Sequence, residues 1–294
     1  MKTKLHIFKV VAEQLSFTKA SELLFISQPA VSKTIKNLEE TYKCNLFIRK
    51  RNSITLTDDG KAFLMYANRI WSIYNEMDNQ FLNLKNELPN HIQFGASTTV
   101  ANYIIPKLLA KFKTQYPQVR FEIKSGNSEE IETLILNENL NFGFTEGKNT
   151  NRQLHFKKFI KDEIVLVTNV KNTSIKNNMV NKATLQELPL IEREKGSGTR
   201  DIIYGILKEK KIEKLNTILH LNSTESIKNY LYHSDSFALI SINAVSEDLI
   251  TNKLKIIDIK DITMERWFYF VSRTGYHSQI MNYFEKFANS NYNF

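Results

Sequence analysis

The chain has 294 residues, a net charge of +9, 42 % hydrophobic and 24 % charged residues, and only 9 Gly and 5 Pro, which excludes disordered, collagen-like and linker-dominated proteins. A single cysteine, Cys44, excludes an intramolecular disulfide framework. The first twenty residues make a poor signal peptide, and no apolar run approaches the roughly 18 residues of a membrane span. These features predict a folded cytoplasmic protein of two compact domains, or of one large domain with an appendage.

Positive charge is concentrated at the N-terminus. Residues 1–57 hold ten Lys and Arg against four Asp and Glu, a net charge of +6, whereas the rest of the chain carries 30 against 27, a net charge of +3. Such a distribution indicates a polyanionic partner, either nucleic acid or an anionic membrane surface.

The N-terminal zone shows three short helical patterns between residues 2 and 42, followed by a basic hairpin at residues 46–57. Ser27 is a good N-cap for the third helix, and Pro29 stands in its first turn, where its missing amide costs nothing. On this helix an apolar stripe within about 60° of arc is expected to face a core. The stripe consists of Val31, Ile35, Leu38 and Tyr42.

The opposite face of the third helix carries polar and cationic side chains suited to a DNA major groove. Gln28 can bond an adenine edge, Lys33 and Lys36 can reach guanine acceptors, and Ser32 can hold a phosphate. Charged helix faces more often contact only solvent, so the helix alone leaves both interpretations open.

The segment LSFTKASELLFISQPAVSKTIKNLEETYKCNLFIRKRNSITLTDDGKAFL, residues 15–64, resembles the winged helix-turn-helix of LysR-type transcriptional regulators. The matching features include Ser16-Phe17-Thr18, Ser27 to Ser32, Leu38-Glu39, Leu46-Phe47, Leu56-Thr57 and Gly60. The resemblance, with the charge pattern, implies DNA contacts from Thr18, Gln28, Pro29, Ser32, Lys33, Lys36, Arg49, Lys50 and Arg51.

A long helix is expected from Asp58 to about Leu88, where Pro89 stops it. It carries two seven-residue apolar series, Phe63, Ile70, Met77, Leu84 and Ala67, Tyr74, Phe81, Leu88. They favour a coiled-coil seam with a partner helix, although packing on the chain's own domain is the alternative. The resemblance implies a homodimer through this helix and association of dimers into a homotetramer.

From residue 91 onward, strand-like runs alternate with amphipathic helices, which predicts an α/β domain with a mostly parallel sheet. The resemblance implies an effector-binding domain like periplasmic binding proteins, in which the chain crosses twice between two subdomains. The expected organisation is a winged helix-turn-helix at 1–57, a linker helix at 58–90 and an effector domain at 91–294. Its subdomain I would hold about 91–161 and 268–294, and its subdomain II about 162–267.

Polar residues follow four strands of this domain, at 97–99, 146–147, 196–200 and 222–224. Because ligands of open α/β sheets sit at such corners, near helix N-termini, a small anion is the expected ligand. Serines and threonines there are also routine N-caps without any ligand, and this alternative stays open. The resemblance, carried over residue by residue, implies effector contacts from Ser97, Thr98, Thr99, Glu146, Ser197, Gly198, Thr199 and Arg200.

Within the family, GASTTVANYIIP, GFTEGK and EREKGSGTR look most like the branch that responds to sulfite and related sulfur metabolism, or like carbon-fixation regulators. Glu146 would repel a dianion unless it is protonated or faces a positive group, so a monoanion such as bisulfite, or a ligand with an amine, is easier to hold. Ser234-Asp235-Ser236 replaces the family's glycine-containing turn, which leaves that turn's conformation open.

The sequence therefore predicts a regulator that binds double-stranded promoter DNA, itself and a small effector, without a cofactor; RNA polymerase is left open as a partner. No membrane partner is expected, because no amphipathic membrane-surface helix accounts for the positive charge. A solute-binding protein and an enzyme are the alternatives. The six histidines lie at least 13 residues apart, and HExxH, GxSxG and Walker motifs are missing, so no catalytic or metal-binding residue is expected.

Overall fold

The computed structural model describes residues 2–50, 53–82, 91–148, 151–276 and 283–287. It divides into one unit of residues 1–87 and 137–139 and a second of residues 88–136 and 140–294. Within the described residues, no helix combines the length and the apolar character needed to cross a membrane.

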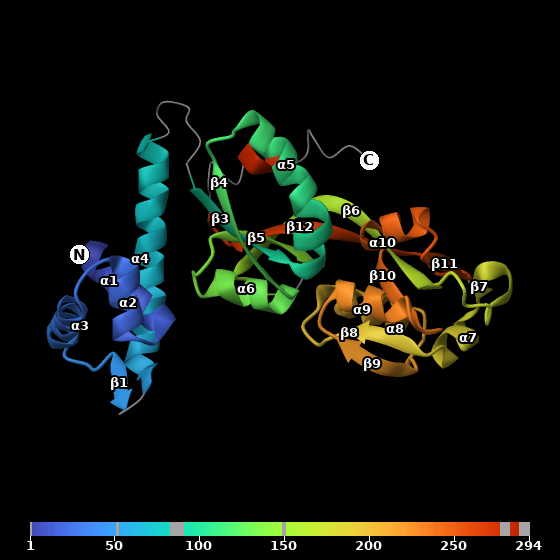
Figure 1. The fold of residues 1–294 in the computed structure, drawn as a ribbon, viewed down its shortest axis with the longest axis horizontal. Helices are drawn as coiled ribbons and strands as arrows, with labels where there is room; N and C mark the ends of the chain where they lie inside the picture. Colours follow the sequence, from blue (N-terminus) through green and yellow to red (C-terminus); the bar gives the residue numbers. More distant parts are fainter. Residues whose placement is uncertain (1, 51–52, 83–90, 149–150, 277–282, 288–294) are drawn as a thin grey trace. The chain divides into compact units, whose positions relative to one another are not determined.

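The N-terminal unit is a winged helix-turn-helix followed by a long helix (Figure 1). Ser16 and Ser27 cap the second and third helices by accepting hydrogen bonds from the amides of Lys19 and Ala30, which confirms the predicted cap at Ser27. The three helices and the hairpin are confirmed as well. The elements are α1 Lys2–Gln14, α2 Phe17–Leu24, α3 Gln28–Tyr42, β1 Phe47–Lys50, β2 Ser53–Leu56 and α4 Asp58–Leu82.

The predicted apolar stripe of α3 forms part of the core of this unit. Val31, Ile35 and Leu38 are buried, together with Phe8 of α1 and neighbouring side chains. Tyr42 is the exception. It lies in the last turn of α3, remains 48 % exposed and packs edge-on against Phe63.

The helix α4 divides its apolar residues between two faces. Phe63 packs edge-on against Phe8, Ala67 is buried, and Trp71 stacks on His6 of α1. Phe63 of one predicted series and Ala67 and Tyr74 of the other therefore face the chain's own domain. For these three residues the expected contact with a partner helix was wrong, and the alternative, packing on the chain's own domain, holds.

A second stripe of α4 is exposed. Its members are spaced by four, three and four residues, as in a coiled-coil seam. They are Tyr66, Ile70, Ile73 and Met77, with exposed fractions of 39 to 57 %. Ile70 and Met77 belong to the predicted series, whereas Leu84, Leu88 and the side chain of Phe81 lie outside the described residues.

The second unit contains one mixed sheet with the strand order β4-β3-β5-β12-β6-β10-β8-β9, and β11 pairs with β6 and β7. Subdomain I holds β3 to β5 with α5 and α6, and subdomain II holds β7 to β11 with α7 to α10 (Figure 1). The strands are β3 His91–Ser97, β4 Arg120–Gly126, β5 Phe142–Glu146, β6 Leu154–Asn169, β7 Met179–Val180, β8 Leu190–Arg193, β9 Thr217–Leu221, β10 Phe237–Ser241, β11 Leu254–Ile259 and β12 Met264–Arg273. The helices are η2 Val100–Ile104, α5 Ile105–Gln115, α6 Ser128–Leu136, η3 Lys176–Asn178, α7 Lys182–Glu187, α8 Gly198–Glu209, α9 Thr224–Leu231 and α10 Ile242–Ile250.

Parallel pairing holds only inside the subdomains, where β3 pairs with β4 and β5, and β8 pairs with β9 and β10. The long strands β6 and β12 run between the subdomains and pair antiparallel, because one carries the chain across and the other brings it back (Figure 1). The prediction of a mostly parallel sheet was wrong for these two strands. The expected crossing of the chain between two subdomains is what the structure shows.

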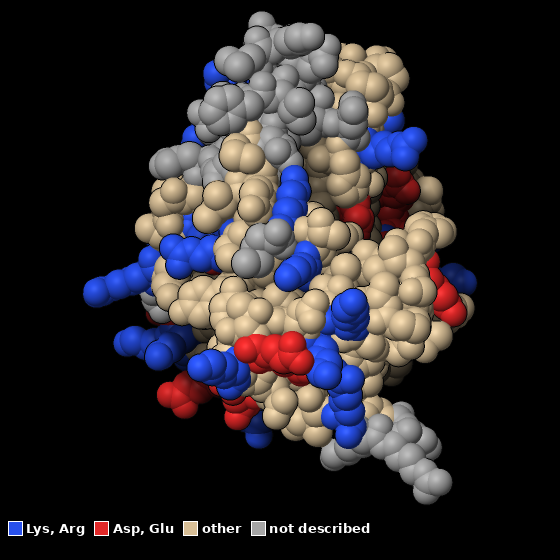
Figure 2. Space-filling model, turned by 90° about the vertical axis from the view of Figure 1, so that its left-hand side faces the viewer, with Lys and Arg blue, Asp and Glu red and all other residues tan. Residues whose placement is uncertain are grey.

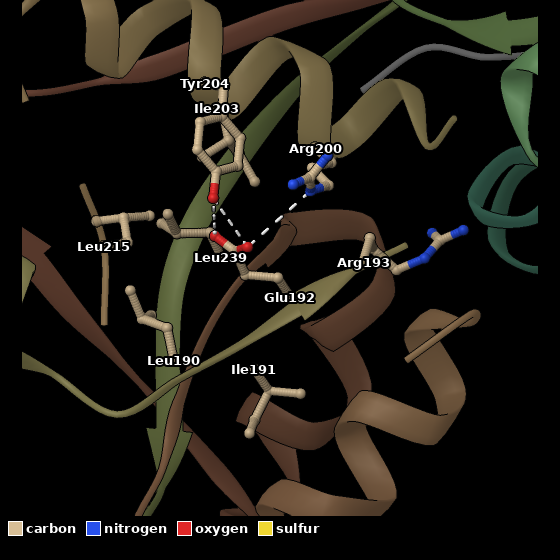
Figure 3. A pocket seen from close by; sticks show the side chains of 9 residues that line it. All are labelled: Leu190, Ile191, Glu192, Arg193, Arg200, Ile203, Tyr204, Leu215 and Leu239. Atoms are coloured by element: carbon tan, nitrogen blue, oxygen red, sulfur yellow. Dashed lines mark hydrogen bonds and ion pairs between the residues drawn. The ribbon is translucent and has the colours of Figure 1, made fainter. Parts of the chain in front are cut away.

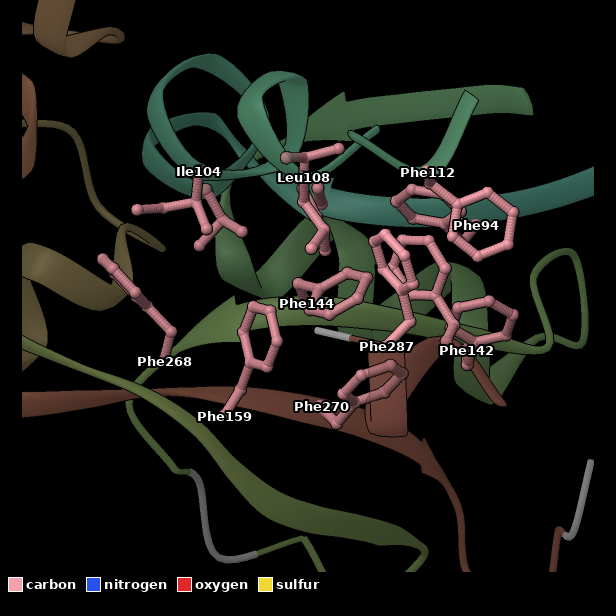
Figure 4. Close-up of a cluster of buried hydrophobic side chains, with 14 of the residues drawn as sticks. Phe94, Ile104, Leu108, Phe112, Phe142, Phe144, Phe159, Phe268, Phe270 and Phe287 are labelled. Atoms are coloured by element: carbon pink, nitrogen blue, oxygen red, sulfur yellow. The ribbon is translucent and has the colours of Figure 1, made fainter. Parts of the chain in front are cut away.

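Each subdomain has its own core. Subdomain I is filled by phenylalanines that meet ring to ring, including Phe94, Phe112, Phe144 and Phe270 (Figure 4). Subdomain II is filled mainly by Leu, Ile and Val from β6, β8, β10 and α8. Each aromatic pair stabilises the fold by about 0.5–1.5 kcal/mol beyond the effect of its buried area. This core therefore holds the polar ends of β3 and β5 in place.

Candidate functional site: a DNA-reading face and an effector crevice

The predicted DNA-reading residues of α3 lie together on the face opposite its buried stripe. Gln28, Pro29, Lys33 and Lys36 are exposed, and Ser32 is half-buried. The Gln28 amide donates a hydrogen bond to the Ser32 hydroxyl at 3.0 Å, so the two side chains orient each other at the N-terminus of the helix. This arrangement presents an amide, a hydroxyl and two ammonium groups to a groove.

Thr18, the predicted DNA contact on α2, is exposed. Lys36 of α3 forms a surface ion pair with Glu40 at 3.7 Å, which contributes little to stability. Lys and Arg side chains are spread over the face seen in Figure 2, with acidic side chains gathered in a few places. The side chain of Lys50 and the whole of Arg51 lie outside the described residues.

Arg49 has a role that the sequence did not reveal. Its guanidinium pairs with Glu39 of α3 at 3.3 Å and lies 4.9 Å from the ring centre of Phe17. Glu39 also accepts hydrogen bonds from the backbone amides of Leu46 and Phe47. Arg49 and Glu39 therefore fasten the wing to the recognition helix.

In the effector domain, the beginning of α8 lies directly against the end of β5. A Cβ atom at Gly198 would come within 2.3 Å of the carbonyl oxygen of Glu146 and 2.6 Å of the Ser128 hydroxyl, so only glycine fits there. Gly147 and Gly196 adopt positive φ angles of 74° and 87° in the adjoining turns. The glycines thus bring two of the predicted corners, one from each subdomain, into contact.

A buried ionic cluster lies at this contact, centred on Arg266, which the sequence analysis missed. Its Nε donates to Asp162 at 2.6 Å, and its Nη1 donates to Glu146 at 3.0 Å and to the Thr199 hydroxyl at 2.7 Å. The three charged side chains are at most 2 % exposed. Because Arg266 and Asp162 are register partners on β12 and β6, the cluster joins both crossing strands to both subdomains.

Glu146 is ionised in this cluster. Burial alone would raise its pKa, but the positive charges of Arg266 and Arg193, with a hydrogen bond from Thr199, hold the pKa below its usual value. The sequence allowed two conditions under which Glu146 would tolerate an anionic ligand, namely protonation of its carboxyl group or pairing with a positive group. The ion pair with Arg266 meets the second condition.

Arg193 is the second guanidinium that the sequence analysis missed. It ends β8 in subdomain II, and its side chain is 4 % exposed. Its Nη2 donates to the hydroxyl of Thr98 in subdomain I at 2.9 Å, and its Nη1 donates to Thr224 at 3.4 Å. Its Nε and Nη2 also bind both carboxylate oxygens of Glu194.

Arg200, the guanidinium that the sequence favoured, contacts other residues of subdomain II. It lies 4.0 Å from Glu192 and stacks over the ring of Tyr204, whose hydroxyl donates to Glu192 (Figure 3). The cavity beside them measures about 10 Å³, room for about one water molecule. In Figure 3, Arg193 points away from Glu192.

The predicted hydroxyls fall into three groups. Those of Thr98, Thr199 and Thr224 accept hydrogen bonds from Arg193 or Arg266, and the others are either N-caps or unpaired. Ser223 accepts a hydrogen bond from the Ser226 amide at 3.1 Å and is a routine cap of α9. Ser197 begins α8 without a side-chain cap. Ser97 and Ser197 are each 1 % exposed, and their hydroxyls have no hydrogen-bond partner among the described residues. Thr99, also a predicted contact, is 1 % exposed.

Ser234-Asp235-Ser236 forms its turn without a glycine. None of the three residues has a positive φ. The carbonyl of Asp235 accepts a hydrogen bond from Asn172, and that of Ser236 accepts one from Thr168. Side-chain donors from outside the turn therefore hold its backbone.

A larger pocket of about 390 Å³ opens beside Glu146, between the starts of α6 and α8. Its lining includes the carboxylates of Glu129, Glu132, Glu146 and Asp201 and a single cation, Lys148. The excess of negative charge disfavours an anion in this pocket.

Family models match both units. The model described as "Bacterial regulatory helix-turn-helix protein, lysR family" matches residues 3–61, and the "LysR substrate binding domain" matches residues 85–290. The chain belongs to the LysR family. It is a DNA-binding transcriptional regulator and not an enzyme, as the sequence predicted.

This LysR regulator is 31 % identical over 96 % of its length to a probable RuBisCO transcriptional regulator of Phaeodactylum tricornutum, covering 94 % of that protein. It is 27 % identical to the HTH-type transcriptional regulator CysL of Bacillus subtilis, over 89 % of the chain and 87 % of CysL. The resemblance to carbon-fixation regulators is thereby confirmed, while sulfite as the effector stays a prediction.

Solved structures share the fold of this LysR regulator at low identity. Full-length CbnR complexed with its target DNA matches with a TM-score of 0.71 and 17 % identity, over 99 % of each chain. The regulatory domain of Synechocystis PCC6803 CcmR, in complex with 2-PG, matches with a TM-score of 0.62 and 21 % identity, over 69 % of this chain and 98 % of that domain.

Proposed function

We propose that this regulator senses a small anionic metabolite in the crevice between its subdomains and, as a dimer, transmits binding to promoter DNA. The supporting observation is the set of buried hydrogen-bond donors without a partner, the hydroxyls of Ser97 and Ser197 and the Nη2 of Arg266. Because an unpaired buried donor costs about 1–3 kcal/mol, a ligand that accepts their hydrogen bonds would account for these donors.

The dimer is proposed from the exposed stripe of α4, Tyr66, Ile70, Ile73 and Met77. Two copies joined there would present two recognition helices to two half-sites of DNA. A ligand can move such a dimer between arrangements only by as much as it prefers one subdomain closure over another. The contacts of Arg193 and Arg266 across the subdomains make that closure sensitive to an anion.

A thermal-shift screen tests the proposed sensing. Sulfite, sulfate, thiosulfate, O-acetylserine, 2-PG and small carboxylates are the probes, and at least one is expected to raise the Tm of the wild type. At one hundred times its Kd a ligand stabilises by about 2.7 kcal/mol. Ser197→Ala should lose this shift and keep the Tm of the free protein, because its hydroxyl caps nothing.

Ser223→Ala is the matched control. It removes the side-chain cap of α9, so it should cost about 1 kcal/mol in the free energy of unfolding and lower the Tm of the free protein. The rise in Tm caused by the ligand should be the same as in the wild type. A Ser197→Ala variant that keeps the ligand shift would place the ligand elsewhere in the chain.

A further inference from the structure

The guanidinium of Arg193 is already bound by a carboxylate, that of the next residue in the chain. Arg193 Nε lies 2.8 Å from Glu194 Oε2, and Nη2 lies 2.9 Å from Glu194 Oε1. Two parallel N–H to oxygen bonds form the fork by which arginine holds carboxylates and phosphates in ligands. Glu194 therefore makes the contacts that a small oxyanion would make.

The two side chains of this pair are unequally buried. Arg193 is 4 % exposed, whereas Glu194 is 23 % exposed. The hydroxyls of Thr98 and Thr224 hold the guanidinium in addition to Glu194, so it keeps hydrogen bonds if the carboxylate leaves. Glu194 follows the end of β8 and can turn outward to water, while Arg193 is fixed.

The charges around the fork define which anion can replace Glu194. Arg193 and Arg266 both act on Glu146, and Asp162 pairs with Arg266, so with Glu194 the group holds two positive and three negative charges. Without Glu194 it is neutral. A monoanion entering the fork restores the starting balance, whereas a dianion adds a further buried negative charge that nothing compensates.

We propose that the carboxylate of Glu194 occupies the anion site on Arg193 until the effector displaces it. The inference rests on the proposed sensing of an anion and defines its site and class. The ligand group is a monoanion with two oxygens able to bridge Nε and Nη2, such as a carboxylate or bisulfite. Arg193 also donates a hydrogen bond to Thr98 of subdomain I. Replacing Glu194 by the effector would therefore affect the contact between the two subdomains.

Isothermal titration calorimetry of the full-length protein with glycolate, bisulfite and sulfate tests the inference. Glu194→Gln removes the competing charge, so its affinity for glycolate and bisulfite should exceed that of the wild type by about tenfold, a difference of about 1.4 kcal/mol. Sulfate, the dianion, should gain less. Adding Arg193→Gln to Glu194→Gln should abolish the gain.

Glu192→Gln is the matched control, since it makes the same change in net charge two residues away on β8. Glu192 bonds Tyr204, not Arg193, so this variant should keep the wild-type affinities. Glu194→Asp keeps the charge but shortens the side chain, and it should bind the monoanions more tightly than the wild type. It serves as the test if Glu194→Gln does not fold.

Equal affinities of Glu194→Gln, Glu194→Asp and Glu192→Gln for both monoanions would overturn the inference. The proposed sensing function would still stand if an anion stabilised the wild type in the thermal-shift screen. Conversely, a gain of affinity in Glu194→Gln without any effect of the bound anion on DNA binding would support the site and contradict the sensing.

Discussion

Replacing Arg266 with alanine is expected to lower the free energy of unfolding of the effector domain by about 3–5 kcal/mol, because it leaves Glu146 and Asp162 buried without a positive partner. The chain has two tryptophans, Trp71 and Trp267. In a Trp71→Phe background, urea unfolding followed by tryptophan fluorescence reports on Trp267, the residue next to Arg266, and so on this domain.

Lys161→Ala is the matched control, because its ion pair with Glu265 joins the same two strands but is more than half exposed. It should cost no more than about 1 kcal/mol. If Arg266→Ala had the same free energy of unfolding as Lys161→Ala, the buried cluster would not be what holds the two crossing strands together.

The same cluster predicts how the stability of the protein changes at acid pH. Because the pKa of folded Glu146 lies below its unfolded value, its pairing stabilises the wild type above the unfolded pKa of about 4.3, and that stability is lost as pH falls through the folded pKa. Glu146→Gln should lack this part of the acid dependence.

Placing a charge in the exposed stripe of α4 is expected to break the dimer. Ile73→Glu would put two carboxylates into an apolar interface between copies, and loss of the second half-site contact should weaken DNA binding by about 100-fold or more. Analytical ultracentrifugation measures the oligomeric state, and fluorescence anisotropy with duplex DNA measures the affinity.

Lys61→Gln makes the same change in net charge at another exposed position of α4, where Lys61 pairs with the exposed Asp58. It should leave the dimer intact. A dimeric Ile73→Glu protein with unchanged DNA affinity would show that the stripe does not join two copies.

The N-terminal unit was predicted well because its signals are local. The cap at Ser27, the proline at position 29 and the spacing of Val31, Ile35 and Leu38 all act within one or two helical turns. The long helix was harder, since Ala67 and Ile70 lie on neighbouring faces with equally apolar spacing. Only the position of α1 shows which face is free.

The effector crevice was predicted in part. The corners at Glu146 and Thr199 do meet, but the guanidiniums beside them were missed because their partners lie far away in the chain. Arg193 bonds a residue 95 positions earlier, and Arg266 bonds residues 104 and 120 positions earlier. One signal was available for Arg266, which shares the buried phase of its strand with Met264 and Phe268.

We propose that this chain reads DNA sequence through α3 and changes that reading when an anion binds. The most direct measurement is the affinity of the full-length protein for a duplex that it selects from a random library, relative to a shuffled duplex, with and without the stabilising anion.

The wild type should prefer the selected duplex by about 10³ or more, the affinity for both should fall with salt, and the anion should change the preference. Gln28→Ala should lose about 1–3 kcal/mol of the preference. Equal affinities for the two duplexes, in the presence and absence of the anion, would contradict the account.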